Sequence, residues 1–220
     1  MSTREAVLAR IRNALADVPA DERAEDVTVP RGYLRSHAGP DPVALFAERV
    51  TDYRARVTLA DTPSAARRLI AEALAERGVT RLVVPEGFPA DLLPDGPWER
   101  LGDTPALSVE ALDGADAVLT TAARAIALTG TIVLDAGPGQ GRRALTLLPD
   151  FHLCVVRADQ IAPDVPDALA LLDPARPLTF VSGPSATSDI ELDRVEGVHG
   201  PRTLHVVVLT GPEGAEPPGE

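Results

Sequence analysis

Residues 152–183 read HLCVVRADQIAPDVPDALALLDPARPLTFVSG, and this stretch decides the fold class. An apolar, Val/Leu-rich run stands at each end, and a segment with helical spacing (162–174) lies between them. Short continuous apolar runs that alternate with helices are typical of buried parallel strands. We therefore predict an α/β fold with a mostly parallel sheet flanked by helices on both faces. Further runs of this kind are RLVVP (81–85), AVLTT (117–121), TGTIVLDA (129–136) and TLHVVVLTG (203–211).

The N-terminal part of the chain has helical patterns and one long irregular segment. Residues 3–16 predict an amphipathic helix, and the acidic, proline-containing stretch after it predicts an extended arm. Residues 42–57 predict a second helix. Residues 62–78 predict a third, with Thr62 as N-cap and Gly78 at its end. We expect three regions: a helix and arm (1–40), an α/β domain (41–210) and a disordered acidic tail (211–220).

Composition excludes several classes of function. The net charge of −12 repels phosphate backbones, and only 3% of residues are aromatic, so nucleic acid is not an expected partner. All 21 basic residues are arginine, which excludes Schiff-base chemistry on lysine and an ordinary P-loop. No histidine pair has metal-ligand spacing, so we predict no metal site. No apolar run reaches the ~20 residues of a membrane span, and no signal peptide is recognisable. We expect a cytoplasmic protein.

Three polar stretches are candidates for a ligand site, because loops beyond the carboxyl ends of strands bind ligands in open α/β sheets. The first is residues 125–149. Thr129, Gly130 and Thr131 lead into a strand, and GPGQG follows it. The glycines allow close approach of the backbone to a ligand, and Arg142 or Arg143 could hold an anion. The alternative is a turn with solvated arginines.

The second candidate follows the strand LTFV. Gly183, Ser185 and Thr187 precede a predicted helix that begins at Ser188 and ends at Gly197. Ser188 and Glu191 fit a capping box, and the helix start offers free N–H groups to a carboxylate or phosphate. Capping alone also explains Ser188 and Glu191, but it does not explain the additional glycine, proline and serine before them.

The third candidate, VHGPR (198–202), lies just before the last predicted strand. His199 could act as an acid or base near neutral pH, and Arg202 could bind an anion next to Gly200. The alternative is a plain turn in which Gly-Pro sets the geometry. His205 lies inside a predicted strand, His152 opens one and His37 lies in the arm, so all three are weaker candidates.

Four motifs in order carry a resemblance to a known family. TGTIVL, RRALTLLPDFHLCVV, LTFVSGPSATSDIE and GVHGPRTLHVVV together resemble the lactate utilization protein C family, whose members contain a LUD domain. The similarity covers roughly residues 40–210. It implies a NagB/RpiA/CoA-transferase-like fold and a cluster-free component of a three-part system that oxidises L-lactate to pyruvate. It also implies iron–sulfur partners, the lactate utilization proteins A and B. This chain has one cysteine, Cys154, and cannot hold a Cys₄ cluster by itself.

On this basis, three functions remain open. In the first, the chain handles a small carboxylate for lactate oxidation, with Arg143 or Arg202 as the counter-charge and His199, Asp189 and Glu191 as catalytic candidates. In the second, it is a free-standing CoA-transferase-like enzyme with Glu191 or Glu196 as nucleophile. In the third, it is a non-catalytic scaffold that binds a small carboxylate.

Overall fold

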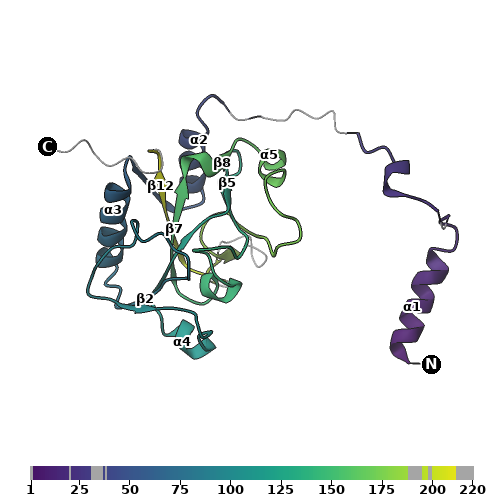
Figure 1. Cartoon of the computed structure of the whole chain (residues 1–220), viewed down its shortest axis with the longest axis horizontal. Helices are drawn as coiled ribbons and strands as arrows, with labels where there is room; N and C mark the ends of the chain where they lie inside the picture. Colours follow the sequence, from purple (N-terminus) through teal and green to yellow (C-terminus); the bar gives the residue numbers. More distant parts are fainter. Residues whose placement is uncertain are drawn as a thin grey trace. The chain divides into compact units, whose positions relative to one another are not determined.

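The computed structural model describes residues 2–19, 21–30, 37, 39–187, 195–197 and 200–211. The chain divides into two compact units, Met1–Leu34 and Arg35–Glu220. In the first unit, helix α1 (Thr3–Ala14) confirms the predicted N-terminal helix, and a short 3-10 turn, η1 (Ala24–Asp26), follows it (Figure 1). Ser2 and Glu5 cap α1 reciprocally, which satisfies free N–H groups of its first turn.

The second unit contains the sheets and the remaining helices. Its helices and 3-10 turns are α2 (Pro42–Asp52), α3 (Pro63–Glu76), α4 (Val109–Asp113), η2 (Arg143–Thr146), η3 (Ala158–Gln160) and α5 (Val165–Leu169). Its strands are β1 (Arg56–Ala60), β2 (Arg81–Val83), β3 (Glu99–Leu101), β4 (Ala117–Thr121), β5 (Arg124–Ile126), β6 (Thr131–Leu134), β7 (Phe151–Arg157), β8 (Ile161–Ala162), β9 (Thr179–Val181), β10 (Ala186–Thr187), β11 (Val195–Glu196) and β12 (Thr203–Leu209).

The main sheet has six strands in the order β1-β12-β7-β4-β2-β3, and every neighbouring pair is parallel. The predicted α/β fold with a mostly parallel sheet is therefore confirmed. Both faces of its central strands are buried, so their sequences are continuously apolar rather than alternating. In β7, for example, Leu153 and Cys154 are both fully buried although they point to opposite faces.

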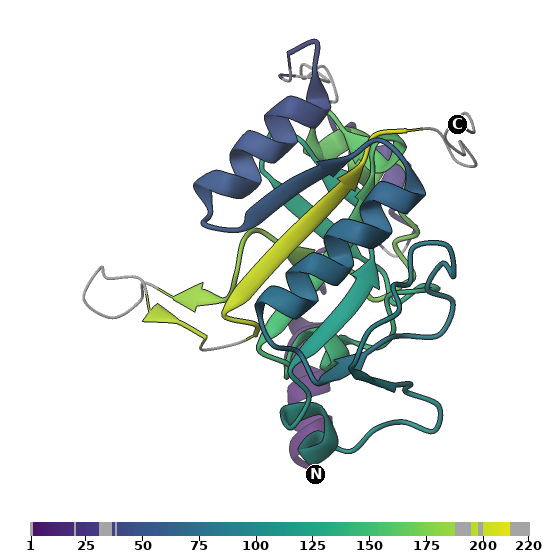
Figure 2. The ribbon, with the colours of Figure 1, turned by 90° about the vertical axis from the view of Figure 1, so that its left-hand side faces the viewer.

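Two different layers cover the main sheet. Ile70 and Leu74 of α3 pack with Leu153 and Val207 on one face, and Figure 2 shows α3 lying alongside β12. Each such buried aliphatic side chain contributes about 1.5–3 kcal/mol. On the other face, α2 and a smaller sheet pack together against Cys154, Val156, Val206 and Val208.

The smaller sheet has four strands in the order β8-β5-β6-β9. Its β5/β6 and β6/β9 pairs are antiparallel, and α5 covers its outer face through Ala168. Two runs that the sequence pattern groups with the other strands, TGTIVL and LTFV, lie in this sheet as β6 and β9. The predicted helix 162–174 is shorter than expected, since α5 spans only Val165–Leu169 after its N-cap Asp164.

Two other helix predictions are partly wrong. The predicted helix 42–57 ends at Asp52, because Arg54 has a positive φ of 66° and Arg56 already begins β1. The predicted helix 188–197 lies largely outside the described residues. Its last turn is contradicted, since Val195–Glu196 form β11 and pair antiparallel with β10.

Candidate functional site

A cavity of about 260 Å³ lies at the amino ends of β7 and β12, next to the carboxyl end of β9. Three groups of residues supply its wall. Arg143 and Thr146 come from η2, and His152 and Leu204 come from the starts of β7 and β12. The remaining wall consists of residues 180–185 and 200–201. The site is thus at the edge of the main sheet opposite to the carboxyl edge that the sequence pattern indicated.

Four of the predicted ligand-binding residues meet in this cavity: Arg143, Gly183, Ser185 and Gly200. Arg143 and Gly200 are 57 positions apart in the sequence. Thr187 belongs to β10. The predicted catalytic residues Asp189, Glu191 and His199 lie outside the described residues.

Thr129, Gly130 and Thr131 lie behind the cavity rather than in its wall. The hydroxyl of Thr131 is 2.8 Å from that of Ser182, which does line the cavity, and 2.7 Å from that of Thr129. Gly130 has a φ of 58°, and a Cβ there would come within 2.8 Å of the backbone nitrogen of Val50 in α2. The TGT segment therefore supports the cavity through hydroxyl contacts and close packing.

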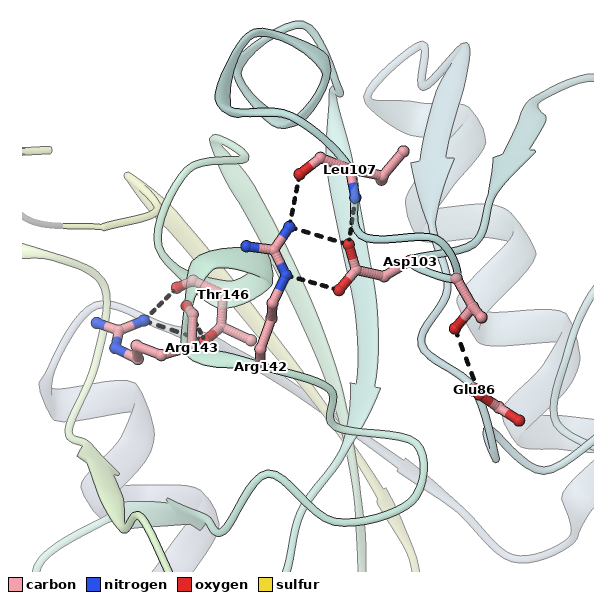
Figure 3. Close-up of polar contacts among 7 residues, drawn as sticks. Glu86, Asp103, Leu107, Arg142, Arg143 and Thr146 are labelled. Atoms are coloured by element: carbon pink, nitrogen blue, oxygen red, sulfur yellow. Dashed lines mark hydrogen bonds and ion pairs between the residues drawn. The ribbon is translucent and has the colours of Figure 1, made fainter.

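The two neighbouring arginines have different partners (Figure 3). Arg142 donates to both carboxylate oxygens of Asp103, at 2.7 and 3.0 Å, and to the carbonyl oxygen of Leu107 at 2.7 Å. Hydrogen bonding to Arg142 holds the pKa of Asp103 below its usual range. Arg142 thus links the segment after β3 to the loop before β7, and Asp103 already compensates its charge.

Arg143 has no carboxylate partner among the described residues. Its Nη1 donates to the carbonyl oxygen and hydroxyl of Thr146, at 2.8 and 3.0 Å. Loss of water around the guanidinium lowers the pKa of Arg143, but an arginine stays charged at neutral pH. No acidic residue is among the described residues of the cavity wall. Arg143 therefore leaves further N–H donors for an anion.

Arg202 does not fill the role that the sequence suggested. It forms an ion pair with Asp150 through Nε and is not part of the cavity wall. Of the two predicted counter-charges, only Arg143 lines the cavity.

His152, which ranks as a weaker candidate from sequence because it opens a predicted strand, lies in the cavity wall. It is 2% exposed, and its Nε2 lies 2.8 Å from the hydroxyl of Thr120. Burial, and then the charge of Arg143, lower the pKa of His152 to about 4, so its ring is neutral at physiological pH. The strand pattern contains the signal, because His152 alternates with Leu153 and so shares a face with Cys154, toward the smaller sheet.

Gly183 fixes the turn that closes the cavity. Its φ is 79°, and a Cβ there would lie 2.6 Å from Cβ of Tyr53. A larger residue would need a strained backbone and would displace Tyr53, which follows α2. The glycine of the second candidate stretch is thus required by the backbone conformation and by close packing.

Nothing in the described ranges indicates a metal or a reactive thiol. There, no group of three or more His, Cys, Asp or Glu side chains is arranged to hold a metal ion. Burial raises the pKa of Cys154 to about 12, which suits an inert core residue. Within the same residues, no helix is long and apolar enough to cross a membrane.

The fold and the cavity define an α/β protein with a parallel six-stranded sheet and a small polar cavity, in which Arg143 has no carboxylate partner among the described residues. The chain belongs to the LUD domain family, whose model matches residues 43–209. This confirms the resemblance that the four sequence motifs carry.

Several relatives have names or structures that can be compared. Lactate utilization protein C of Deinococcus radiodurans is 52% identical over 171 residues, which cover 74% of this chain and 77% of that protein. Lactate utilization protein C of Halalkalibacterium halodurans is 34% identical over 109 residues, 46% of this chain and 47% of that protein. A crystal structure of a DUF162 family protein from Deinococcus radiodurans is 42% identical, with a TM-score of 0.64, and covers 76% of this chain and 96% of that one.

Proposed function

We propose that this protein acts in lactate utilization by binding a small carboxylate, L-lactate or pyruvate, in the cavity beside Arg143. The observation that carries the proposal is that Arg143, whose printed hydrogen bonds engage only Nη1, lies in a cavity whose described wall has no acidic residue. The names of the two relatives support the process.

The chemistry of the cavity suits a small anion. A guanidinium has five N–H donors, and Thr146 occupies only Nη1 of Arg143. The hydroxyl of Ser182 lies in the same wall, and it can donate to a carboxylate while it accepts from the hydroxyl of Thr131. With a net charge of −12, the chain repels anions at long range, so a local cation is needed to retain one.

The role in the pathway is that of the cluster-free component in the oxidation of L-lactate to pyruvate. Electron transfer then belongs to iron–sulfur partners, the lactate utilization proteins A and B, because a single cysteine cannot ligate a Cys₄ cluster. The CoA-transferase-like fold class is part of the same proposal, as are acid–base roles for His199, Asp189 and Glu191.

The binding test compares the two adjacent arginines. L-lactate and pyruvate are titrated into purified wild-type protein, Arg143→Gln and Arg142→Gln, with thermal unfolding measured for each. We expect Arg143→Gln to lose at least about tenfold in affinity, which corresponds to about 1.4 kcal/mol. Arg142→Gln removes a cation of the same loop that the cavity does not use, so its affinity stays at the wild-type level.

The pathway test uses cells that lack only this gene. Their extracts are assayed for lactate-dependent dye reduction, with purified protein added back. Wild-type protein restores activity, whereas Arg143→Gln, Ser185→Ala, Asp189→Ala and His199→Ala restore less. Full activity in the deletion extract would remove the protein from lactate oxidation, and CoA-dependent substrates would then be tested.

A further inference from the structure

One ring nitrogen of His152 is available to a molecule in the cavity. The residue is 2% exposed and belongs to the cavity wall. Its Nε2 is engaged with Thr120, but Nδ1 has no hydrogen-bond partner in the described part of the chain. In the described residues, two side-chain polar atoms are fully buried and lack a hydrogen-bond partner: Trp98 Nε1 and Arg124 Nε. His152 Nδ1 is not one of them. Because Nδ1 has no partner there and is not fully buried, it is open to the cavity, where a ligand can hydrogen-bond to it.

The partner of Nε2 lets Nδ1 act either as acceptor or as donor. A threonine hydroxyl can accept a hydrogen bond from Nε2–H or donate one to unprotonated Nε2. In the first case Nδ1 offers a lone pair, and in the second it carries a hydrogen. The ring is neutral in both tautomers, so the change requires no net charge in the core.

The cavity thus combines two kinds of recognition. Arg143 provides a cation for a carboxylate. Burial is the larger cause of the lowered pKa of His152 and the charge of Arg143 is the second, so the two groups interact electrostatically. His152 provides a neutral nitrogen that accepts from a hydroxyl or donates to a carbonyl oxygen.

We propose that His152 is a specificity-determining residue which selects carboxylic acids that carry an oxygen on the adjacent carbon, in both the 2-hydroxy and the 2-oxo form. The proposal rests on the proposed carboxylate site and deepens it by naming the residue that recognises the oxygen on the adjacent carbon. His152 accepts from the hydroxyl of a 2-hydroxy acid and, in the other tautomer, donates to the carbonyl of a 2-oxo acid.

The test titrates L-lactate, pyruvate and propionate, which has the same carbon count but no oxygen on the second carbon, into the purified full-length protein. We expect wild type to bind lactate and pyruvate about tenfold more tightly than propionate, which one hydrogen bond accounts for. His152→Gln keeps an amide near Thr120 but removes the nitrogen at the Nδ1 position, so it should bind all three acids as weakly as wild type binds propionate. His152→Asn places an amide near the Nδ1 position and should restore part of the preference.

A second readout follows the tautomer of His152 in the wild-type protein. ¹⁵N NMR of the four histidines reports the tautomer of each ring, and His152→Gln identifies the signal. Lactate should shift His152 toward the Nε2–H form and pyruvate toward the Nδ1–H form. Equal binding of the three acids by wild type, or an unchanged tautomer, overturns the role of His152 and leaves the carboxylate site intact. No binding of any of the three overturns the carboxylate site as well.

Discussion

The buried histidine of the cavity makes the stability of the protein depend on pH. The ordinary pKa of a histidine is 6.5, whereas burial and Arg143 lower that of His152 to about 4 in the fold. Between these values the unfolded chain binds a proton at this site and the folded chain does not, so stability is lost as the pH falls from about 6.5 to about 4. The difference corresponds to about 3 kcal/mol from this residue once the pH is below both values.

The assay is denaturant unfolding of wild type and His152→Gln from about pH 7.5 to about pH 4.5. Glutamine lacks the titration but can keep a contact with Thr120. The free energy of unfolding of wild type should fall by about 2.5 kcal/mol more than that of the variant over this range. The pKa of His205 is also lowered to about 4, chiefly by burial, and remains the same in both proteins, so the difference isolates His152. Parallel pH profiles for the two proteins would refute the assignment of a neutral, desolvated ring.

Two further predictions concern the turn and the core around the cavity. Gly183→Ala should destabilise the protein by about 2–3 kcal/mol in denaturant unfolding and weaken carboxylate binding, because of the φ of 79° and the 2.6 Å approach to Tyr53; wild-type stability would contradict the turn geometry. Cys154 should resist alkylation in the native protein and react only as the protein unfolds, since burial raises its pKa to about 12; rapid labelling of folded protein would contradict its burial.

The main sheet could be predicted from sequence because burial on both faces leaves a strong signal. In β7 and β12 nearly every residue is buried, so the strands are continuous apolar runs whatever their neighbours are. The division into two sheets could not be predicted this way. TGTIVL and LTFV are also short, largely apolar runs, and their antiparallel pairing as β6 and β9 places them in the smaller sheet.

The polar stretches predict the residues of the cavity better than they predict the local secondary structure. Gly183 and Ser185 are identifiable from sequence as candidate ligand-binding residues, because the glycine, proline and serine of their turn exceed what a helix cap requires. The Ser188–Glu191 pattern predicted a helix up to Gly197, yet Val195 and Glu196 pair with β10. His152 ranks as a weaker candidate from sequence because it opens an apolar strand, and its partner Thr120 is 32 positions away in the sequence.

The position of the cavity follows from the connections between the parallel strands. After β4 ends at its carboxyl edge, the chain must return to the opposite edge before β7 can run parallel to it. Residues just before a parallel strand are therefore carried to the amino edge. Arg143 precedes β7 and Gly200 precedes β12, so both meet there, while the short strand β9 brings Gly183 and Ser185 to the same place. A search of the carboxyl edge alone does not reach this candidate cavity, because the smaller sheet supplies a second wall at the amino edge.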